Sequence, residues 1–284
     1  MNVAEAYARC EAVTRAEARN FSYGIRLLPK PKRQAMSALY AVARRIDDIG
    51  DGTDPSALKL DALAVTRKHL AAIGADPAAA GDDPILVALA DAVRRYPIPM
   101  SALEELIDGC EMDVNGAPYE TFDELVGYCR RVAGTVGRLS LGVYGCDDPA
   151  AATPLADALG VALQVTNILR DVVEDRDTMG RVYLPRADLD RFGAGHDLRG
   201  PVDNVVAVIA FEAARAETWY AEGLRLLPML DRRSRACTAT MAGIYRRLLV
   251  RIQRDPVEVL HTRVSLPPWE KAQVAFSGLT RGRA

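Results

Sequence analysis

Two pairs of aspartates carry the clearest chemical signal in the sequence. Asp47 and Asp51 lie four residues apart in "RRIDDIGDG", with Asp48 between them. Asp171 and Asp175 repeat this spacing in "LRDVVEDRD". In an α-helix, side chains at i and i+4 lie on one face about 6 Å apart, close enough for two carboxylates to share a cation. Both pairs are therefore candidates for a divalent metal site.

Each aspartate pair extends a longer polar stripe. At 100° per residue, the first pair falls within one arc of its helix together with Tyr40, Arg44 and Asp48. The second pair shares its arc with Gln164 and Asn167. The other positions around the second stripe are apolar, namely Leu159, Ala162, Val165, Leu169, Val172 and Val173. Such a helix is expected to be buried, and buried carboxylates and amides need a partner.

The ligand type indicates which metal such a site would hold. Neither pair has a histidine or cysteine beside it, and oxygen ligands alone suit a hard cation, Mg²⁺ first and Mn²⁺ as the alternative. Mg²⁺ typically takes one or two carboxylates and leaves its other positions to water and phosphate oxygens. Two such clusters facing one cavity would bind a polyphosphate through bridging metals. A single DxxxD is more often a solvated acidic face, so the hypothesis depends on both pairs.

Carboxylates at this spacing also repel one another. An arginine lies close upstream of each pair, Arg44 before the first and Arg170 before the second. We expect metal ions and arginines to offset the repulsion when substrate is bound, and water to do so when it is absent.

The composition limits the classes of function that remain. The chain has 284 residues, 49% of them hydrophobic, and 36 basic against 38 acidic residues give a net charge of -2, so no nucleic-acid partner is expected. Its 5 cysteines form no CxxC pair, which favours a reducing cytoplasm. The N-terminus lacks the pattern of a secretory signal. The longest apolar run, "VVAVIAF", is far shorter than the roughly 20 residues that cross a bilayer.

Helical periodicity dominates the rest of the sequence. In "RQAMSALYAVARRI" the apolar residues recur at three- and four-residue spacing, and alternating β-branched runs are nearly absent. Breaks are expected where proline and glycine cluster, at 27–33, 74–84, 96–99, 114–121, 146–154 and 184–201. We predict a single all-α domain over residues 1–284, a helical bundle around a central core.

Four stretches resemble the squalene/phytoene synthase family, the head-to-head trans-prenyltransferases. They are "NFSYGIRLLPKPKRQAMSALYAVARRIDDIGD", "YCRRVAGTVG", "LGVALQVTNILRDVVEDRDTMGRVYLP" and "HTRVSL", in family order and spacing over most of residues 15–268. The resemblance implies an all-α isoprenoid-synthase-type fold with a central apolar cavity, whose mouth lies between the two aspartate motifs.

The resemblance also implies roles for individual residues. The implied metal ligands are Asp47, Asp51, Asp171 and Asp175, with Asp48 as a further participant. The implied substrate contacts are Arg19, Asn20, Phe21, Tyr128, Gln164, Asn167, Arg170, Arg181 and Arg263. The implied catalytic residues are Tyr40, Arg44, Tyr183 and Tyr245. Many members carry a serine and a lysine before the aromatic residue of the first motif. Here Arg19 keeps a positive charge, while Asn20 weakens the case for a serine-type phosphate contact.

Simpler roles remain open for several of these residues. Arg44 can pair with Asp47 or Asp48 on its own helix, and Arg181 can be an ordinary solvated arginine in a loop. Tyr128 and Tyr245 lie in apolar helices, where packing with a satisfied hydroxyl explains them equally well.

The reaction implied by the resemblance joins two prenyl diphosphates head to head. "SYGIRLLPKPKR" with "RRIDDIGDG" is most similar to bacterial presqualene diphosphate synthases of hopanoid pathways, which favours two farnesyl diphosphates as substrates. Phytoene or dehydrosqualene synthesis is the alternative, as is squalene synthesis with NADPH. No GxGxxG follows a strand, and NADPH is not expected. Downstream hopanoid or carotenoid enzymes, and peripheral contact with the inner face of the membrane, complete the implied partners.

Two other classes remain. One is a different enzyme on the same fold, a terpene cyclase or a head-to-tail synthase, and "DDIGD" does match the DDxxD of head-to-tail synthases. The other is a noncatalytic helical protein that binds a partner. "DVVED" followed by "GRVYLP" favours head-to-head coupling over both.

Overall fold

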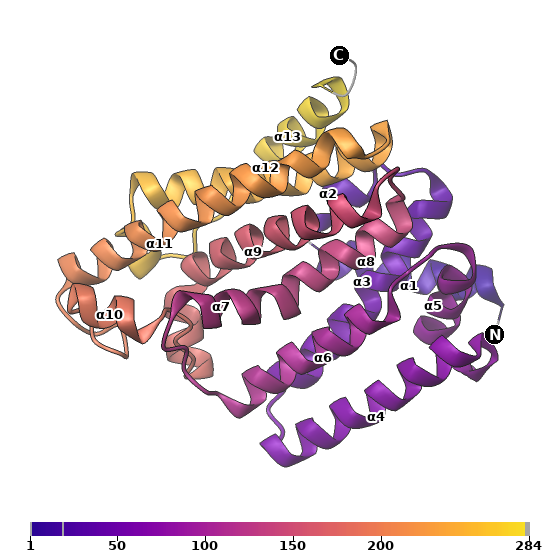
Figure 1. Ribbon diagram of the computed structural model, residues 1–284, viewed down its shortest axis with the longest axis horizontal. Helices are drawn as coiled ribbons and strands as arrows, with labels where there is room; N and C mark the ends of the chain where they lie inside the picture. The colour runs from indigo at the N-terminus through magenta and orange to yellow at the C-terminus, as the bar shows by residue number, and fades with distance from the viewer. Residues whose placement is uncertain (1, 19, 282–284) are drawn as a thin grey trace.

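The computed structural model describes residues 2–18 and 20–281, and throughout these ranges the regular elements are helices (Figure 1). The all-α prediction is confirmed. The α-helices are α1 Val3–Glu17, α2 Phe21–Ile25, α3 Lys30–Asp51, α4 Ser56–Ala75, α5 Pro84–Arg95, α6 Met100–Asn115, α7 Phe122–Cys129, α8 Thr135–Tyr144, α9 Pro149–Glu174, α10 Arg186–Phe192, α11 Val202–Gly223, α12 Arg232–Arg254 and α13 Pro268–Arg281. Arg19, an expected substrate contact, lies outside the described residues.

Helix α9 is central to the packing. It contacts α7 and α8 on one side and α11 and α12 on the other, and Figure 1 shows it running between these two sets. The Asp148 side chain accepts a hydrogen bond from the Ala151 N–H, and a proline occupies the first turn, so the helix starts with a side-chain cap. The expectation that this helix is buried is confirmed, because half of its positions, including Leu159, Val165 and Leu169, are buried.

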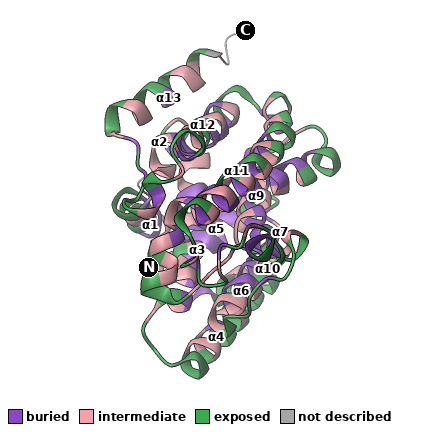
Figure 2. Cartoon of the chain, turned by 90° about the vertical axis from the view of Figure 1, so that its left-hand side faces the viewer, coloured by how far each residue is buried: buried purple, intermediate pink, exposed green. Residues whose placement is uncertain are grey.

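Two large apolar clusters form the core. One joins α7, α9, α11 and α12, and the other joins α3, α4, α5, α6 and α8. Phe21 and Val132 pack against both. Figure 2 shows buried residues on the faces that helices turn toward one another, whereas the outer faces of α4 and α13 are largely exposed. The boundary between the clusters is where the site described below lies.

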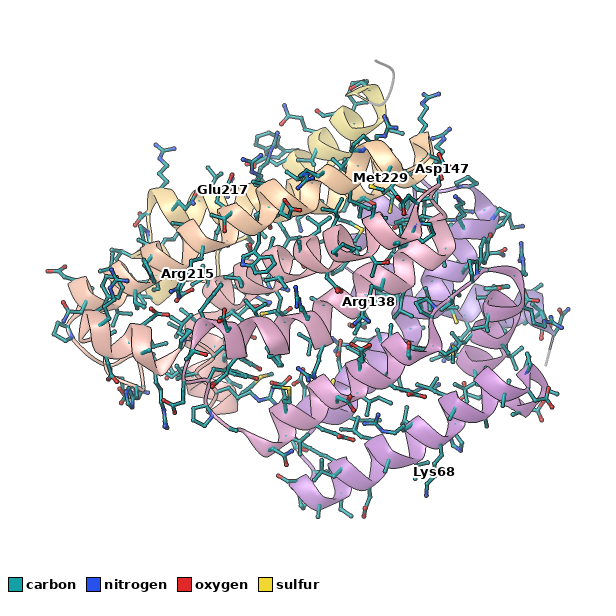
Figure 3. All side chains as sticks on the ribbon, viewed as in Figure 1. Lys68, Arg138, Asp147, Arg215, Glu217 and Met229 are labelled. Atoms are coloured by element: carbon teal, nitrogen blue, oxygen red, sulfur yellow. The ribbon has the colours of Figure 1, made fainter. Side chains whose placement is uncertain are left out.

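A partly buried arginine ties three helices together near this boundary. Arg138 of α8, labelled in Figure 3, is 2.6 Å from a carboxylate oxygen of Glu105 on α6 and 3.0 Å from one of Asp157 on α9. Its side chain is 19% exposed, so these pairs are better shielded from solvent than surface ion pairs. They hold α8 in register with both neighbours.

Two π-helical segments adjoin the site. Arg130–Gly134 joins α7 to α8, and Asp175–Met179 continues α9. The prediction that Asp171 and Asp175 share an α-helix is therefore only partly right, because Asp175 begins the π-helical turn. The expected break at 184–201 also needs correction, since it contains the short helix α10. Such π-helical turns are frequent at functional sites.

Close contact between α9 and the α7–α8 unit requires glycine. A Cβ built on Gly160 would lie 2.5 Å from the Gly134 backbone nitrogen and 2.6 Å from the Ala133 carbonyl. Real Cβ atoms do not approach backbone so closely, so the two helices can meet only without a side chain here.

We expect Gly160→Ala to lower the free energy of unfolding by about 1–3 kcal/mol, because backbone must shift to accept the methyl group. Urea unfolding followed by circular dichroism measures the change. Gly74→Ala in α4 is the matched control, since its Cβ would meet only the Met100 side chain, at 3.6 Å. The control should be neutral or stabilising. Equal losses in both variants would contradict the proposed close crossing.

Candidate active site

A polar cavity of about 350 Å³ opens at the boundary between the two apolar clusters. All four aspartates of the two DxxxD pairs line it, the first pair from α3 and the second from α9 and its π-helical extension. The structure thus brings together the residues on which the metal hypothesis depends. The cavity also includes Arg44, Tyr128, Gln164, Asn167, Arg170, Glu174, Arg181, Tyr183 and Arg263.

A second cavity, of about 270 Å³ and mainly apolar, continues from the first. Arg44, Asp47, Val132, Gln164 and Asn167 line both cavities, so charged groups lie at one end of an apolar chamber. The chamber is walled by Phe21, Ile25, Met36, Leu39, Tyr40, Ala43, Ala133, Val136, Leu139, Ser140, Leu163 and Met241. Such a pair of cavities suits a molecule with an anionic head and an apolar tail.

Burial shifts the acidity of two of the four aspartates. Burial, together with the nearby Asp51 carboxylate, raises the pKa of Asp47 to about 7. Burial, with Asp171 and Glu174 close by, raises the pKa of Asp175 to about 7. A divalent cation would compensate this unfavourable charge and would compete with protons for both carboxylates.

Arginines neutralise the other two aspartates. Arg181 donates to Asp51 at 2.9 Å, and Arg263 donates to both oxygens of Asp171 at 2.8 and 3.2 Å. Arg170 donates to the same Asp171 carboxylate at 2.8 Å through its Nε. The expectation that water offsets the repulsion when no substrate is bound needs correction for Asp51 and Asp171, because guanidinium groups already pair with them. Arg181 is therefore no ordinary solvated loop residue.

Asp48 lies apart from the other four aspartates. It does not line the polar cavity but a different hollow beside α4 and α5, lined also by Leu58, Lys59 and Ile85. Its carboxylate is 2.8 Å from an Arg44 nitrogen, the simple same-helix pairing that the sequence left open. The structure gives no support to Asp48 as a metal ligand.

Asp113 of α6 is a candidate residue that sequence reasoning missed. It lines the polar cavity and accepts hydrogen bonds of 2.9 Å from the hydroxyls of Tyr128 and Tyr183. Burial raises the pKa of its carboxyl, even though Arg181 and the two tyrosines oppose this. A signal was present, because the apolar face of α6 runs through Leu106 and Cys110 to position 113, where an aspartate is out of place.

The remaining expected residues take different positions. Phe21 and Tyr40 line the apolar chamber, whereas Asn20 precedes α2 and makes no side-chain capping bond. Tyr245 lines neither cavity; it packs on Phe21, with ring centroids 5.7 Å apart, and under the Arg170 guanidinium. The Asn167 Oδ1 atom is buried and has no hydrogen-bond partner among the described residues. An acceptor left unpaired at the junction of the two cavities fits a ligand or metal-bound water.

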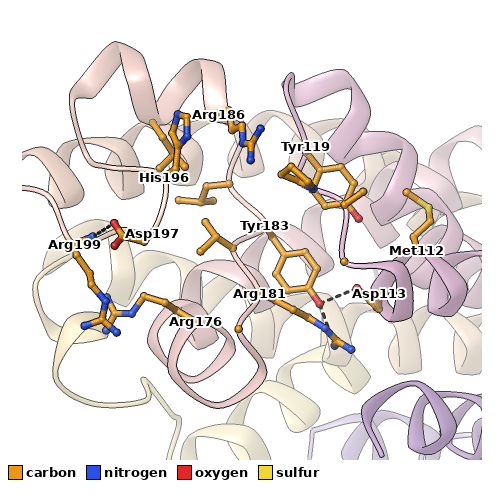
Figure 4. Close-up of a pocket in the computed structure, with 17 residues that line it drawn as sticks. Met112, Asp113, Tyr119, Arg176, Arg181, Tyr183, Arg186, His196, Asp197 and Arg199 are labelled. Atoms are coloured by element: carbon orange, nitrogen blue, oxygen red, sulfur yellow. Dashed lines mark hydrogen bonds between the residues drawn. The ribbon is translucent and has the colours of Figure 1, made fainter. Parts of the chain in front are cut away.

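Another cavity, of about 450 Å³, lies behind Asp113, Arg181 and Tyr183 (Figure 4). Further arginines and a histidine line it, but each has a carboxylate partner: Arg176 and Arg199 pair with Asp177, Arg186 pairs with Glu120, and His196 pairs with Asp190. Because these side chains are already paired, we assign no role to this cavity.

The family model for squalene/phytoene synthase matches residues 14–270. The chain belongs to the squalene/phytoene synthase family. Family members are head-to-head prenyltransferases, and the family assignment agrees with the resemblance seen in the sequence. Phytoene synthases of Mycobacterium tuberculosis and Arthrospira platensis are 49% and 37% identical to this chain, over 98% and 94% of its length and 91% and 90% of theirs.

Solved structures of the family share the fold. A dehydrosqualene synthase superposes with a TM-score of 0.89 at 28% identity, covering 99% of this chain and 98% of its own. The squalene synthase HpnC of Alicyclobacillus acidocaldarius superposes with a TM-score of 0.80 at 32% identity, covering 89% and 94%. The predicted isoprenoid-synthase-type fold is thereby confirmed. Within residues 2–18 and 20–281, no helix is long and apolar enough to span a bilayer.

The donor set fits the divalent metal with which family enzymes bind diphosphates. The four DxxxD carboxylates and an unpaired amide oxygen face one cavity, and all are oxygen ligands. Among the described residues, however, no three acidic, histidine or cysteine side chains already converge on one point. Arginines that now pair with Asp51 and Asp171 would have to release them, and phosphate oxygens would complete the coordination.

We expect Asp47→Asn to stabilise the protein without metal at pH 8 while abolishing Mg²⁺-dependent turnover. A carboxyl whose pKa is raised by folding favours the native state at low pH, and that contribution is lost as pH rises from about 4 through 7. A neutral amide removes the loss, and each kcal/mol gained raises Tm by roughly 2–4 °C.

Thermal unfolding at pH 5.5 and pH 8, with EDTA present, measures this effect. Asp48→Asn is the matched control, because Asp48 is exposed and lies outside the polar cavity. If both variants gained equally in Tm at pH 8, the result would contradict the claim that the buried charge of Asp47 destabilises the protein.

We also expect Asp113→Asn to lower kcat/KM by about 10–100-fold, because the two tyrosine hydroxyls lose a charged acceptor worth about 1.5–3 kcal/mol. Tyr183→Phe should give a similar loss, and the double variant little more than either alone. Steady-state kinetics measures all three. Asp108→Asn on the same helix, where the carboxylate pairs with Arg67, should keep full activity. Additive losses would argue against a shared role.

Proposed function

We propose that this protein is a phytoene synthase, which joins two geranylgeranyl diphosphates head to head. The observation that carries the proposal is the pair of connected cavities, one lined by both DxxxD pairs and several arginines, the other apolar. An anionic diphosphate and an apolar prenyl chain are thereby accommodated side by side. A noncatalytic protein that only binds a partner would not need this pair of cavities.

The charged cavity supports ionisation of the first substrate. Asp47, Asp51, Asp171 and Asp175 would hold Mg²⁺, whose positive charge stabilises the diphosphate as it leaves. Arg181 and Arg263 would then shift from carboxylates to phosphate oxygens, a bidentate contact for which the guanidinium group is suited. The carbon–oxygen bond breaks, diphosphate takes the electron pair, and an allylic cation remains in the apolar chamber.

The apolar chamber supports coupling. The C2=C3 double bond of the second substrate attacks C1 of the cation, and loss of a proton closes a cyclopropane that still carries one diphosphate. Val132, Val136 and Leu139 line the chamber and would keep water from the cation. Loss of that second diphosphate, ring opening and loss of another proton would give phytoene without a reductant.

The structure narrows the choice of proton acceptor. Tyr40 lines the apolar chamber, and burial raises the pKa of its hydroxyl to about 12, so that this phenol stays neutral. Tyr128 and Tyr183 donate to Asp113 in the polar cavity. A neutral phenol is a weak base, so we propose the released diphosphate as acceptor, with Tyr40 orienting the substrate.

The choice of substrate length rests on the relatives. The curated proteins at 49% and 37% identity are named phytoene synthases, and this favours geranylgeranyl over farnesyl diphosphate. The sequence expectation, presqualene diphosphate from two farnesyl diphosphates, stays a prediction and is our second candidate. It is supported by the HpnC squalene synthase, at 32% identity. Cytoplasmic location, contact with a membrane surface, and carotenoid or hopanoid enzymes downstream likewise remain predictions.

The test is to incubate the pure protein with Mg²⁺ and either farnesyl or geranylgeranyl diphosphate, with and without NADPH. The products are then identified by mass spectrometry. We expect phytoene from geranylgeranyl diphosphate without NADPH. Presqualene diphosphate from farnesyl diphosphate, with no turnover of the longer substrate, would establish the second candidate instead. A cyclised product of one substrate, or a head-to-tail product, would overturn both. Asp171→Asn is the control that should form no product.

A further inference from the structure

A small cavity lies beyond the apolar chamber. Its volume is about 50 Å³, and its lining is almost wholly apolar: Gly137, Leu141, Tyr144, Ala156, Leu159, Gly160, Leu226 and Thr238, with Ala133, Val136, Ser140 and Met241. The last four residues also line the apolar chamber, so they form the boundary between the two spaces. We call this space the end cavity and those four residues the divider.

The end cavity continues the axis of the chamber. Tyr128 and Val132 line the polar cavity, residues between Val132 and Ser140 line the chamber, and residues between Ala133 and Tyr144 line the end cavity, along α7, the π-helical segment and α8. The two apolar spaces therefore overlap along this stretch, and the end cavity reaches about one helical turn, or roughly 5.4 Å, farther from the aspartates than the chamber does. An extended prenyl chain with its diphosphate at the aspartates would point toward it.

The divider has one flexible member. Ala133, Val136 and Ser140 are short and belong to the π-helical segment and α8, whose backbone is held against α9 by the contact at Gly160. Met241 comes from the facing helix α12 and is the long, unbranched side chain of the set. Its Sδ is 3.9 Å from the Cys237 sulfur and its Cγ lies near Gly24, so it is seated between α2 and α12. Methionine adapts its rotamers to fill or to open such a gap.

We propose that Met241 sets the length of prenyl chain that this enzyme accepts, by separating the apolar chamber from the end cavity. The inference rests on the proposed function, since it assumes a prenyl tail in the chamber. A shorter side chain at 241 joins the two spaces and makes more room for the distal isoprene unit of the longer chain. A bulkier one shortens the chamber and favours the shorter chain.

The test compares chain-length preference in variants of the full chain. Wild type and Met241→Ala receive farnesyl and geranylgeranyl diphosphate in competition with Mg²⁺, and the ratio of products gives the ratio of kcat/KM values. We expect Met241→Ala to shift the ratio about tenfold toward the longer substrate, since pocket depth discriminates on that scale. Met241→Phe should shift the ratio in the opposite direction. Leu163→Ala is the matched control, because Leu163 lines the chamber beside Gln164, near its charged end, and not the end cavity.

A second variant and a binding measurement keep the test informative if a variant at position 241 folds poorly or turns over slowly. Ser140→Val narrows the divider from α8, and it should shift the preference toward the shorter substrate. Dissociation constants for unreactive thiodiphosphate analogues of both lengths should follow the same order. Binding ratios that do not change at position 241, or that change equally in Leu163→Ala, would overturn the inference. Wild type that binds both analogues but forms no head-to-head product would overturn the proposed function alone, and the binding ratios would still decide the role of Met241.

Discussion

The balance of charge at the junction between a polar and an apolar cavity is the constraint on which the rest of this structure depends. The four carboxylates of the DxxxD pairs face a space whose inner end is apolar, and their charge cannot be left uncompensated there. Arginines on two separate loops supply the compensation for Asp51 and Asp171. Among residues 2–18 and 20–281, no arginine forms an ion pair with Asp47 or Asp175, and burial raises the pKa of both to about 7. Without substrate, two of these four carboxylates are therefore neutralised by arginine, and the other two are suited to bind a cation.

This division has a counterpart in the fold: Arg181 and Arg263 come from loops, whereas Asp171 and its other partner, Arg170, come from a long helix. Asp47 is held by α3 and Asp171 by α9. Ile46, next to Asp47, belongs to one apolar cluster, and Leu169 and Val172, near Asp171, belong to the other, so the core sets the distance across the cavity. Arg181 follows the π-helical turn after α9, and Arg263 follows α12. Loop residues can exchange a carboxylate for a phosphate with little cost to the core, because few packed contacts depend on them.

The sequence was sufficient for the parts of the site that repeat a helical period. The spacing of Asp47 and Asp51, the stripe through Gln164 and Asn167, and the apolar surroundings of the second stripe all express one helix face, which sequence alone can predict. Asp48 shows the limit of that argument. An arc of about 100° is wide enough to include residues at its edges that turn to a different hollow, and only the packing of α4 and α5 decides which way they face.

Residues whose role depends on contacts between distant segments could not be predicted in this way. Asp113 is a candidate site residue because it accepts hydrogen bonds from Tyr128 and Tyr183, which come from two other parts of the chain. The π-helical turns, and the short helix within residues 184–201, likewise arise from tertiary packing that overrides local preference.

The same distinction, between features of one helix and contacts among several, separates ionisation of the substrate from selection of its chain length. Ionisation needs charges at fixed spacing, and a motif of a few residues on one helix can specify them. Selection among prenyl chains of different length needs a floor at a particular depth, and the divider that we propose as this floor comes from the π-helical segment Arg130–Gly134, α8 and α12. Small changes in packing can move the floor while leaving every charged group in place. On our proposal, sequence motifs at the mouth identify the reaction, whereas the opposite end of the chamber, which requires no motif, selects the length of the prenyl chain.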